Sequence, residues 1–137
     1  MHVAARRQNG IILVEALVAV LLFSLGILAL VGLQATMSKN VTEAKLRSES
    51  AFLANQLIGQ MWVDQLNLNN YAMNNGVCTN GGFANCTNWR TRVGQQLPNG
   101  SANVTIAGTA VNIQLTWRLP GEDAVPGQFE VDANITN

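Results

Sequence analysis

One carboxylate stands inside an otherwise apolar stretch of this chain. The stretch from Ile11 to Leu33 reads IILVEALVAVLLFSLGILALVGL, and Glu15 is its single charged residue. A carboxylate in a membrane helix costs roughly 2.5–3.5 kcal/mol at the centre and less toward an end, so it usually marks a partner or a pathway. A cut after Gly10 would give Ile11 a positive α-amine, which Glu15 of a neighbouring helix could bind. Because a buried ion pair offsets its desolvation only when both partners are present, this pairing would fix the register between subunits.

The two cysteines, Cys78 and Cys86, lie in a segment rich in Asn and Gly. Their spacing excludes a C-x-x-C redox centre, and without a nearby histidine they are a very weak signal for zinc. In an oxidising compartment the two thiols pair with each other or with another chain. We favour the internal disulfide, which would stabilise the fold by somewhat under about 3 kcal/mol in the chain-entropy model.

The inventory of reactive side chains gives no basis for catalysis. His2 is the only histidine, and it precedes the apolar stretch. Glu122 and Asp123 are adjacent acids, but the surrounding Pro and Gly residues indicate a solvated turn rather than a general acid–base pair. We therefore predict a protein that is not an enzyme and that uses no cofactor and no metal.

Two further sets of residues are weak binding candidates. One set could offer oxygens to calcium, although its alternation is typical of the wet face of a strand; it consists of Glu130, Asp132 and Asn134. The other set combines basic and aromatic side chains as nucleic-acid-binding proteins do; it consists of Arg90, Arg92, Arg118 and Trp89. A few surface arginines are the more ordinary interpretation of the second set.

The apolar residues are concentrated in one segment of the chain. Of 137 residues 48% are hydrophobic and 12% charged, with zero net charge, which excludes a disordered chain and a uniformly basic nucleic-acid binder. The stretch from Ile11 to Leu33 is long enough to cross a bilayer, and Arg6 and Arg7 before it predict a cytoplasmic N-terminus. A plain single-pass anchor is one alternative. A cleaved secretory signal is another, disfavoured by the length of the stretch and the lack of a small-x-small site.

The segment RRQNG-IILVEALVAVLLFSLGILALVGLQ resembles the cleavage and methylation segment of type IV prepilins. The shared features are a short basic leader, Gly10 before the cut, an apolar helix, and Glu15 as the fifth residue after the cut. Within that family, SLGIL from Ser24 and GLQ from Gly32 are most similar to the PilV-type minor pilins, and the pseudopilins of type II secretion share much of this pattern. Two residues depart from the major subunits: Ile11 replaces the usual Phe, and Gly32 replaces the usual Pro.

The resemblance implies a leader at residues 1–10, cleavage between Gly10 and Ile11 by prepilin peptidase, N-methylation of Ile11 by the same enzyme, and recruitment into a filament through Glu15. The implied protein is a minor pilin that helps to initiate or assemble a type IV pilus and waits in the bacterial inner membrane. Its implied partners are other minor and major pilins, the peptidase, the membrane and a tip adhesin, but not nucleic acid. A type II secretion pseudopilin is the alternative, and a DNA-uptake pilin is a more distant one.

The rest of the sequence predicts an α+β fold, in which a long helical stem packs on a small antiparallel sheet of about three strands. The absence of Pro and an apolar spacing of three, four or seven residues predict one helix from about Ile12 to Leu68. Residues 11–33 would cross the membrane, and residues 34–137 would form a periplasmic head. The expected apolar stripe consists of Met37, Val41, Ala44, Ala51, Ala54, Leu57, Ile58, Met61 and Trp62.

The segment from Asn69 to Asn99 is predicted to form turns, because Asn and Gly tolerate left-handed backbone. Beyond it, alternation with period two predicts the strands, and the turn from Ala107 to Ala110 joins the first two as a hairpin. Their expected inward residues are Val104 and Ile106; Val111, Ile113, Leu115 and Trp117; and Phe129, Val131, Ala133 and Ile135.

Overall fold

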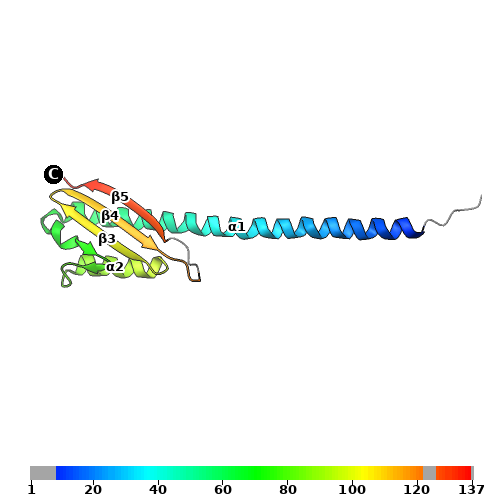
Figure 1. Ribbon diagram of the computed structural model, residues 1–137. Helices are drawn as coiled ribbons and strands as arrows, with labels where there is room; N and C mark the ends of the chain where they lie inside the picture. The colour runs from blue at the N-terminus through cyan, green and yellow to red at the C-terminus, as the bar shows by residue number, and fades with distance from the viewer. Residues whose placement is uncertain (1–8, 122–125, 137) are drawn as a thin grey trace, which may run out of the picture. The chain divides into compact units, whose positions relative to one another are not determined.

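The computed structural model describes residues 9–121 and 126–136, and its elements define an α+β protein, as predicted. In chain order these are α1 (Asn9–Val63), the 3-10 helix η1 (Gln65–Tyr71), β1 (Met73–Asn74), β2 (Val77–Cys78), α2 (Ala84–Gln96), β3 (Ser101–Ala107), β4 (Ala110–Trp117) and β5 (Gly127–Asn134) (Figure 1). The contacts group into two units, one ending at Val41 and one beginning at Thr42. We call the second unit the head. The acids Glu122 and Asp123 and the leader residues before Asn9 lie outside the described residues.

Helix α1 ends at Val63, short of the predicted end at Leu68. Asp64 leaves helical geometry with φ −129°, and the chain continues as η1, which buries Leu68 and Tyr71. The prediction of one helix up to Leu68 was therefore wrong. Neither Pro nor Gly marks the end of α1; the tighter 3-10 turn instead rotates two large side chains into the core.

The part of α1 within the head buries one face, whose members follow one another at short helical spacings: Leu46, Ser50, Leu53, Ala54, Leu57 and Met61. The predicted stripe was correct at Ala54, Leu57 and Met61 but wrong at Met37, Val41, Ala44 and Trp62, which are exposed. Trp62 lies about 100° around the helix from Met61, which turns it out of the buried face. The polar member of this face, Ser50, donates its hydroxyl to the carbonyl of Leu46 at 2.8 Å.

The sheet has five antiparallel strands in the order β2-β1-β3-β4-β5, where about three were predicted. The β3–β4 hairpin turns between Ala107 and Ala110 as predicted, and Gly108 supplies the positive φ (+66°) that a tight two-residue turn requires. Strands β4 and β5 pair along their whole length, from Ala110 opposite Asn134 to Trp117 opposite Gly127. The unpredicted β1 and β2 form a short hairpin.

The predicted inward faces of the strands are confirmed. In β4 every expected residue is buried: Val111, Ile113, Leu115 and Trp117. In β3, Val104 is buried and Ile106 packs at the margin of the core. The inward side chains of β5 (Phe129, Val131 and Ala133) are half-buried, because β5 pairs only with β4 and forms one edge of the sheet.

The prediction of turns throughout residues 69–99 was wrong, because this segment contains α2. A buried side chain recurs every three or four residues along α2 and just beyond it: Cys86, Trp89, Val93 and Leu97. The indole Nε1 of Trp89 donates to the carbonyl of Leu53 at 2.9 Å, which joins α2 to α1. Both helices therefore contribute to the single core on one face of the sheet.

Candidate functional site

The N-terminal part of α1 has no covering partner within the described residues. Every side chain from Gly10 to Val41 is exposed, including large apolar ones such as Leu13 (65%), Phe23 (71%) and Leu28 (69%). By length and composition α1 could cross a membrane. A helix that is apolar all round is stable only in lipid or among other helices, so this surface calls for one of those environments.

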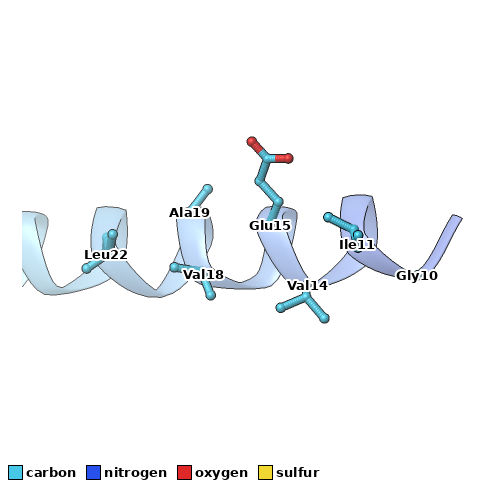
Figure 2. Close-up of a pocket in the computed structure, with 7 residues that line it drawn as sticks. All are labelled: Gly10, Ile11, Val14, Glu15, Val18, Ala19 and Leu22. Atoms are coloured by element: carbon cyan, nitrogen blue, oxygen red, sulfur yellow. The ribbon is translucent and has the colours of Figure 1, made fainter. Parts of the chain in front are cut away.

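Glu15 projects from this surface one helical turn beyond Ile11. Figure 2 shows its carboxylate pointing away from the helix on the same side as Ala19, whereas Val14 points to the other side. The neighbouring residues Val18 and Leu22 are exposed apolar side chains (48% and 62%). Within the described residues no hydrogen bond or ion pair reaches the Glu15 carboxylate, so the charge lies on an apolar face with no local counter-charge.

Ser24, the other polar side chain between Ile11 and Leu33, is satisfied locally. Its hydroxyl donates to the carbonyl of Val20 at 2.7 Å, one turn earlier in the helix. Such back-bonding lets a hydroxyl sit in lipid without an unsatisfied group. The Glu15 side chain makes no such bond within the described residues (Figure 2). It is therefore the one polar side chain of this stretch that requires an external partner.

Gly10 and Ile11, the predicted cleavage residues, lie in the first turn of α1. A Cβ built on Gly10 meets no atom within 4 Å. The fold of the described residues thus gives no packing reason for glycine at this position.

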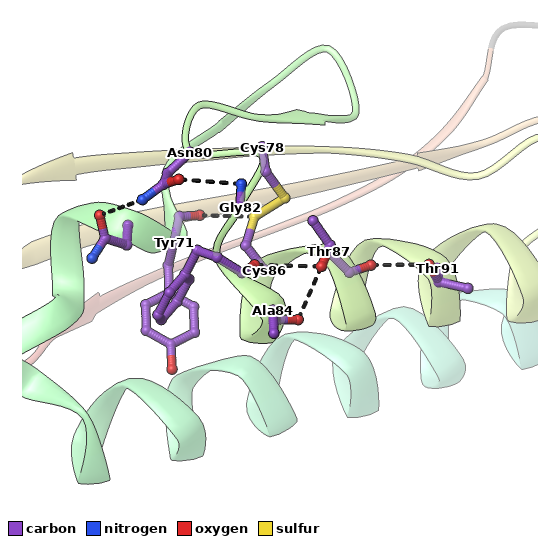
Figure 3. Close-up of a disulfide and its surroundings, with 10 residues drawn as sticks. Tyr71, Cys78, Asn80, Gly82, Ala84, Cys86, Thr87 and Thr91 are labelled. Atoms are coloured by element: carbon purple, nitrogen blue, oxygen red, sulfur yellow. Dashed lines mark hydrogen bonds between the residues drawn. A yellow bond between two sulfur atoms is a disulfide. The ribbon is translucent and has the colours of Figure 1, made fainter.

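In the head, the predicted disulfide is present between Cys78 of β2 and Cys86 of α2, whose Cα atoms are 6.1 Å apart. Figure 3 shows the bridge above Tyr71, with Asn80 and Gly82 in the intervening loop. The Asn80 side-chain oxygen accepts from the backbone N–H of Gly82 at 3.2 Å, and its Nδ2 donates to Asn70 Oδ1 at 3.1 Å. Bridge and hydrogen bonds together hold the loop between β2 and α2 in place.

A polar cluster beneath the disulfide connects the end of α1 to η1 and α2. Asp64 Oδ2 accepts from the Tyr71 hydroxyl at 3.0 Å and from Asn85 Nδ2 at 3.3 Å, and Asp64 Oδ1 accepts from Asn67 Nδ2 at 2.6 Å. Burial raises the pKa of Tyr71; the hydrogen bond from Asn85 opposes this, and Asp64 adds to it. The ring of Phe83 meets that of Tyr71 edge to face at 4.9 Å. This cluster was not predicted from the sequence, where its members are scattered among other polar residues.

The candidate calcium residues do not converge on a cation site. Asn112 Nδ2 donates to Glu130 Oε1 and to Asp132 Oδ1, both at 2.8 Å, so an amide donor lies between the two carboxylates. Asn134 lies on the same exposed face of β5. Among residues 9–121 and 126–136 no group of three or more His, Cys, Asp or Glu side chains could hold a metal ion.

The structure separates the aromatic member of the nucleic-acid candidate from its basic members. Arg90, Arg92 and Arg118 are exposed, but the Trp89 ring is 1% exposed. A buried indole cannot stack on a base. Only the surface arginines of this candidate remain accessible.

Comparison with protein-family models, with curated proteins and with solved structures found no match for this chain.

Proposed function

We propose that this protein is a structural assembly subunit of the minor pilin kind, which is anchored by α1 in the inner membrane and then built into a type IV pilus. The observation that carries the proposal is the lone Glu15 carboxylate on a helix surface that is apolar and exposed over its whole N-terminal part. Such a surface suits a helix that exchanges lipid neighbours for protein neighbours. The proposed chemistry is processing and packing rather than catalysis.

Cleavage between Gly10 and Ile11 would supply the counter-charge that Glu15 lacks. It removes Arg6 and Arg7 with the leader and creates a positive α-amine on Ile11, which stays cationic after N-methylation. The Glu15 carboxylate of one subunit and the Ile11 amine of its neighbour then neutralise each other among apolar helices. Because either charge alone is costly in that environment, the pair selects one register for the incoming subunit.

The head supports an extracytoplasmic location. The disulfide between Cys78 and Cys86 is of a kind that persists in oxidising compartments such as the bacterial periplasm. The basic residues before α1 favour the same orientation, with the N-terminus in the cytoplasm. The head would fold there before assembly, with its disulfide closed.

The test replaces Glu15 by Gln, which keeps the shape of the side chain and removes its charge. We expect Glu15→Gln to reach the membrane and to lose its leader, but to be missing from sheared filaments. Ser24→Ala is the matched control, since it removes the other polar side chain of the stretch without removing a charge, and it should assemble normally. Normal incorporation of the Glu15→Gln protein into filaments would refute the recruitment role.

A pseudopilin of type II secretion would use the same helix chemistry, so the two roles are separated in cells. Deletion of the gene should reduce piliation and twitching motility if the protein is a minor pilin. Loss of protein secretion with normal piliation would assign it to the secretion system instead.

A further inference from the structure

The chain contains five Asn-x-Ser/Thr tripeptides, which begin at Asn40, Asn85, Asn99, Asn103 and Asn134. This tripeptide, with any residue except Pro in the middle, is the acceptor for N-linked glycans in exported proteins. A usable acceptor needs an accessible side-chain amide on backbone that a transferase can reach. The structure distinguishes the five sites on this criterion.

The amides of three of the sites are engaged within the fold. Asn85 Nδ2 donates to Asp64 and Tyr71, and Asn99 Nδ2 donates to the carbonyl of Arg118 at 3.2 Å. Asn103 is half-buried in β3, and its Nδ2 donates to Gln114 Oε1 at 3.3 Å. Glycosylation at any of these sites would replace one of the two N–H groups of an amide that positions a loop or a strand.

A fourth site, Asn40, lies in the interior of α1, far from either end of the helix. Its backbone is held in the helical hydrogen-bond ladder. A transferase would have to unwind more than a turn to reach it, which makes this site a poor acceptor.

Asn134 meets the criterion better than the other four sites. It is the last residue of β5, it is exposed, and its side chain makes no hydrogen bond within the described residues. Thr136, which supplies the hydroxyl of the tripeptide, is exposed and lies beyond the strand. Ile135 between them is buried (3%), and its N–H donates to the carbonyl of Thr109 at 2.8 Å. The site is thus presented on the surface while its middle residue anchors it to the core.

Asn134 is also the only one of the five with an acid two residues before it, Asp132. Asp132 lies on the same exposed face of β5, and its Oδ1 accepts from Asn112 at 2.8 Å. Within the described residues its second oxygen is unoccupied, so a cationic side chain of an enzyme could bind it. We propose that Asp132-Ala133-Asn134-Ile135-Thr136 is an N-glycosylation site and that Asn134 carries the glycan.

The reaction is a group transfer without oxidation or reduction. Asn134 Nδ2 attacks C1 of an oligosaccharide carried on a polyprenyl pyrophosphate, the donor class that a membrane oligosaccharyltransferase uses. The new bond joins Nδ2 to C1, and the bond between C1 and the pyrophosphate oxygen breaks. The polyprenyl pyrophosphate leaves with that electron pair, and Nδ2 loses one proton to a base of the transferase.

The proposal rests on the extracytoplasmic location of the head but not on its assembly into a pilus. A glycan at Asn134 would lie at an edge of the sheet, because β5 pairs only with β4. An open edge strand exposes unpaired backbone groups to other chains. A glycan at Asn134 would cover the end of this edge and disfavour strand-to-strand association of heads.

The test uses the full chain purified from its native cells and digested with trypsin. Arg118 is the last Lys or Arg in the sequence, so the C-terminal peptide begins at Leu119 and contains Asn134 as its only acceptor. We expect this peptide to carry a glycan mass that is absent from Asn134→Gln and Thr136→Val. Thr136→Ser and the matched control Asn99→Gln should retain it. Asp132→Ala should lower the glycosylated fraction by about tenfold or more, as expected for one lost charge-assisted hydrogen bond.

An unmodified wild-type peptide, or a glycan found only at another of the five sites, would overturn the proposal. If the result is negative, the state of the disulfide in the same sample shows which premise failed. If Cys78 and Cys86 are joined, the head was exported and the site itself is wrong. If they are reduced, the location on which the proposal rests is wrong, whereas the role of Glu15 in assembly is judged separately by the filament assay.

Discussion

Gly127 lies directly opposite Trp117 at the start of the β4–β5 pair, and a Cβ atom on Gly127 would overlap the indole ring. Trp117 is 1% exposed and is among the largest side chains of the core. The absence of a side chain at Gly127 therefore lets the ring lie across the strand pair. The register of β5 and the position of this ring depend on each other.

We predict that Gly127→Ala destabilises the head by about 1–3 kcal/mol, because overpacking forces a well-packed ring out of its position. The measurement is chemical denaturation of the detergent-solubilised chain, followed by tryptophan fluorescence. Gly94→Ala is the matched control, since Gly94 lies in α2 with open space around its Cβ position. That control should be neutral or stabilising by up to about 1 kcal/mol, since Ala favours a helix more than Gly does. Equal stability of the Gly127→Ala and wild-type proteins would contradict the steric argument.

The strands could be predicted from the sequence because each carries its own signal. In β4 four apolar residues alternate with polar ones over the whole strand, and the hairpin turn before it contains Gly108. A half-buried strand needs little more than this alternation to define which face is buried. The predicted strand faces and the predicted β3–β4 hairpin were therefore correct.

Helix α2 was not predicted, because the turn-favouring composition of its segment outweighed the helical spacing of its apolar residues. Its buried residues Cys86, Trp89 and Val93 recur at helical spacing, but Thr, Asn and Arg separate them, and the surrounding segment is rich in Asn and Gly, which favour turns. The Asn75-Gly76 turn of the β1–β2 hairpin was likewise hidden within an Asn-rich run, although both of its residues have the positive φ that this dipeptide favours. In α2, tertiary burial rather than local propensity decides the structure.

Of the candidate functional residues, those in α1 could be identified from sequence alone, because an acid in an apolar run is a local signal. The cluster of Asp64, Tyr71 and Asn85 could not be identified, since its members come from three separate segments. Only the end of α1 at Val63 and the docking of α2 bring them together.

We predict that removing the disulfide lowers the stability of the head by about 2–3 kcal/mol, the loop-closure value for a short loop. The variant is Cys78→Ala combined with Cys86→Ala, and the measurement is the same denaturation experiment. Reductant should destabilise the wild-type chain by a similar amount and leave the double variant unchanged. A wild-type chain that is insensitive to reductant would argue against a stabilising bridge.

We predict that Tyr71 ionises only above its ordinary pKa of 10.0, because burial disfavours the phenolate. Because the folded-state pKa of Tyr71 is raised, its neutral hydroxyl contributes to the stability of the fold in full below about pH 10, the ordinary tyrosine value. That contribution is lost as the pH rises through the folded-state pKa. The chain contains a single tyrosine, so the near-ultraviolet absorbance of tyrosinate reports Tyr71 alone. Alkaline titration of the folded chain should give a midpoint above 10.0, whereas the denatured chain should titrate at the ordinary value.

Tyr71→Phe provides the control for this titration. It removes the absorbance change and also the alkaline loss of stability that Tyr71 causes. A folded-state midpoint at or below that of the denatured chain would show that burial of the hydroxyl does not control its ionisation.

The last prediction concerns Gly10, where no packing within the described fold requires glycine. Because a Cβ on Gly10 meets no atom within 4 Å, we expect Gly10→Val to leave the folding of α1 and the head intact. If the proposed cleavage follows Gly10, a β-branched side chain next to that bond should nevertheless block the peptidase. Mass spectrometry of the membrane fraction should then find the Gly10→Val chain with residues 1–10 still attached and the wild-type chain without them. Gly26→Ala, at another uncrowded position of α1, should be processed like the wild type. Cleavage of the Gly10→Val chain at wild-type efficiency would show that glycine at this position serves neither folding nor processing.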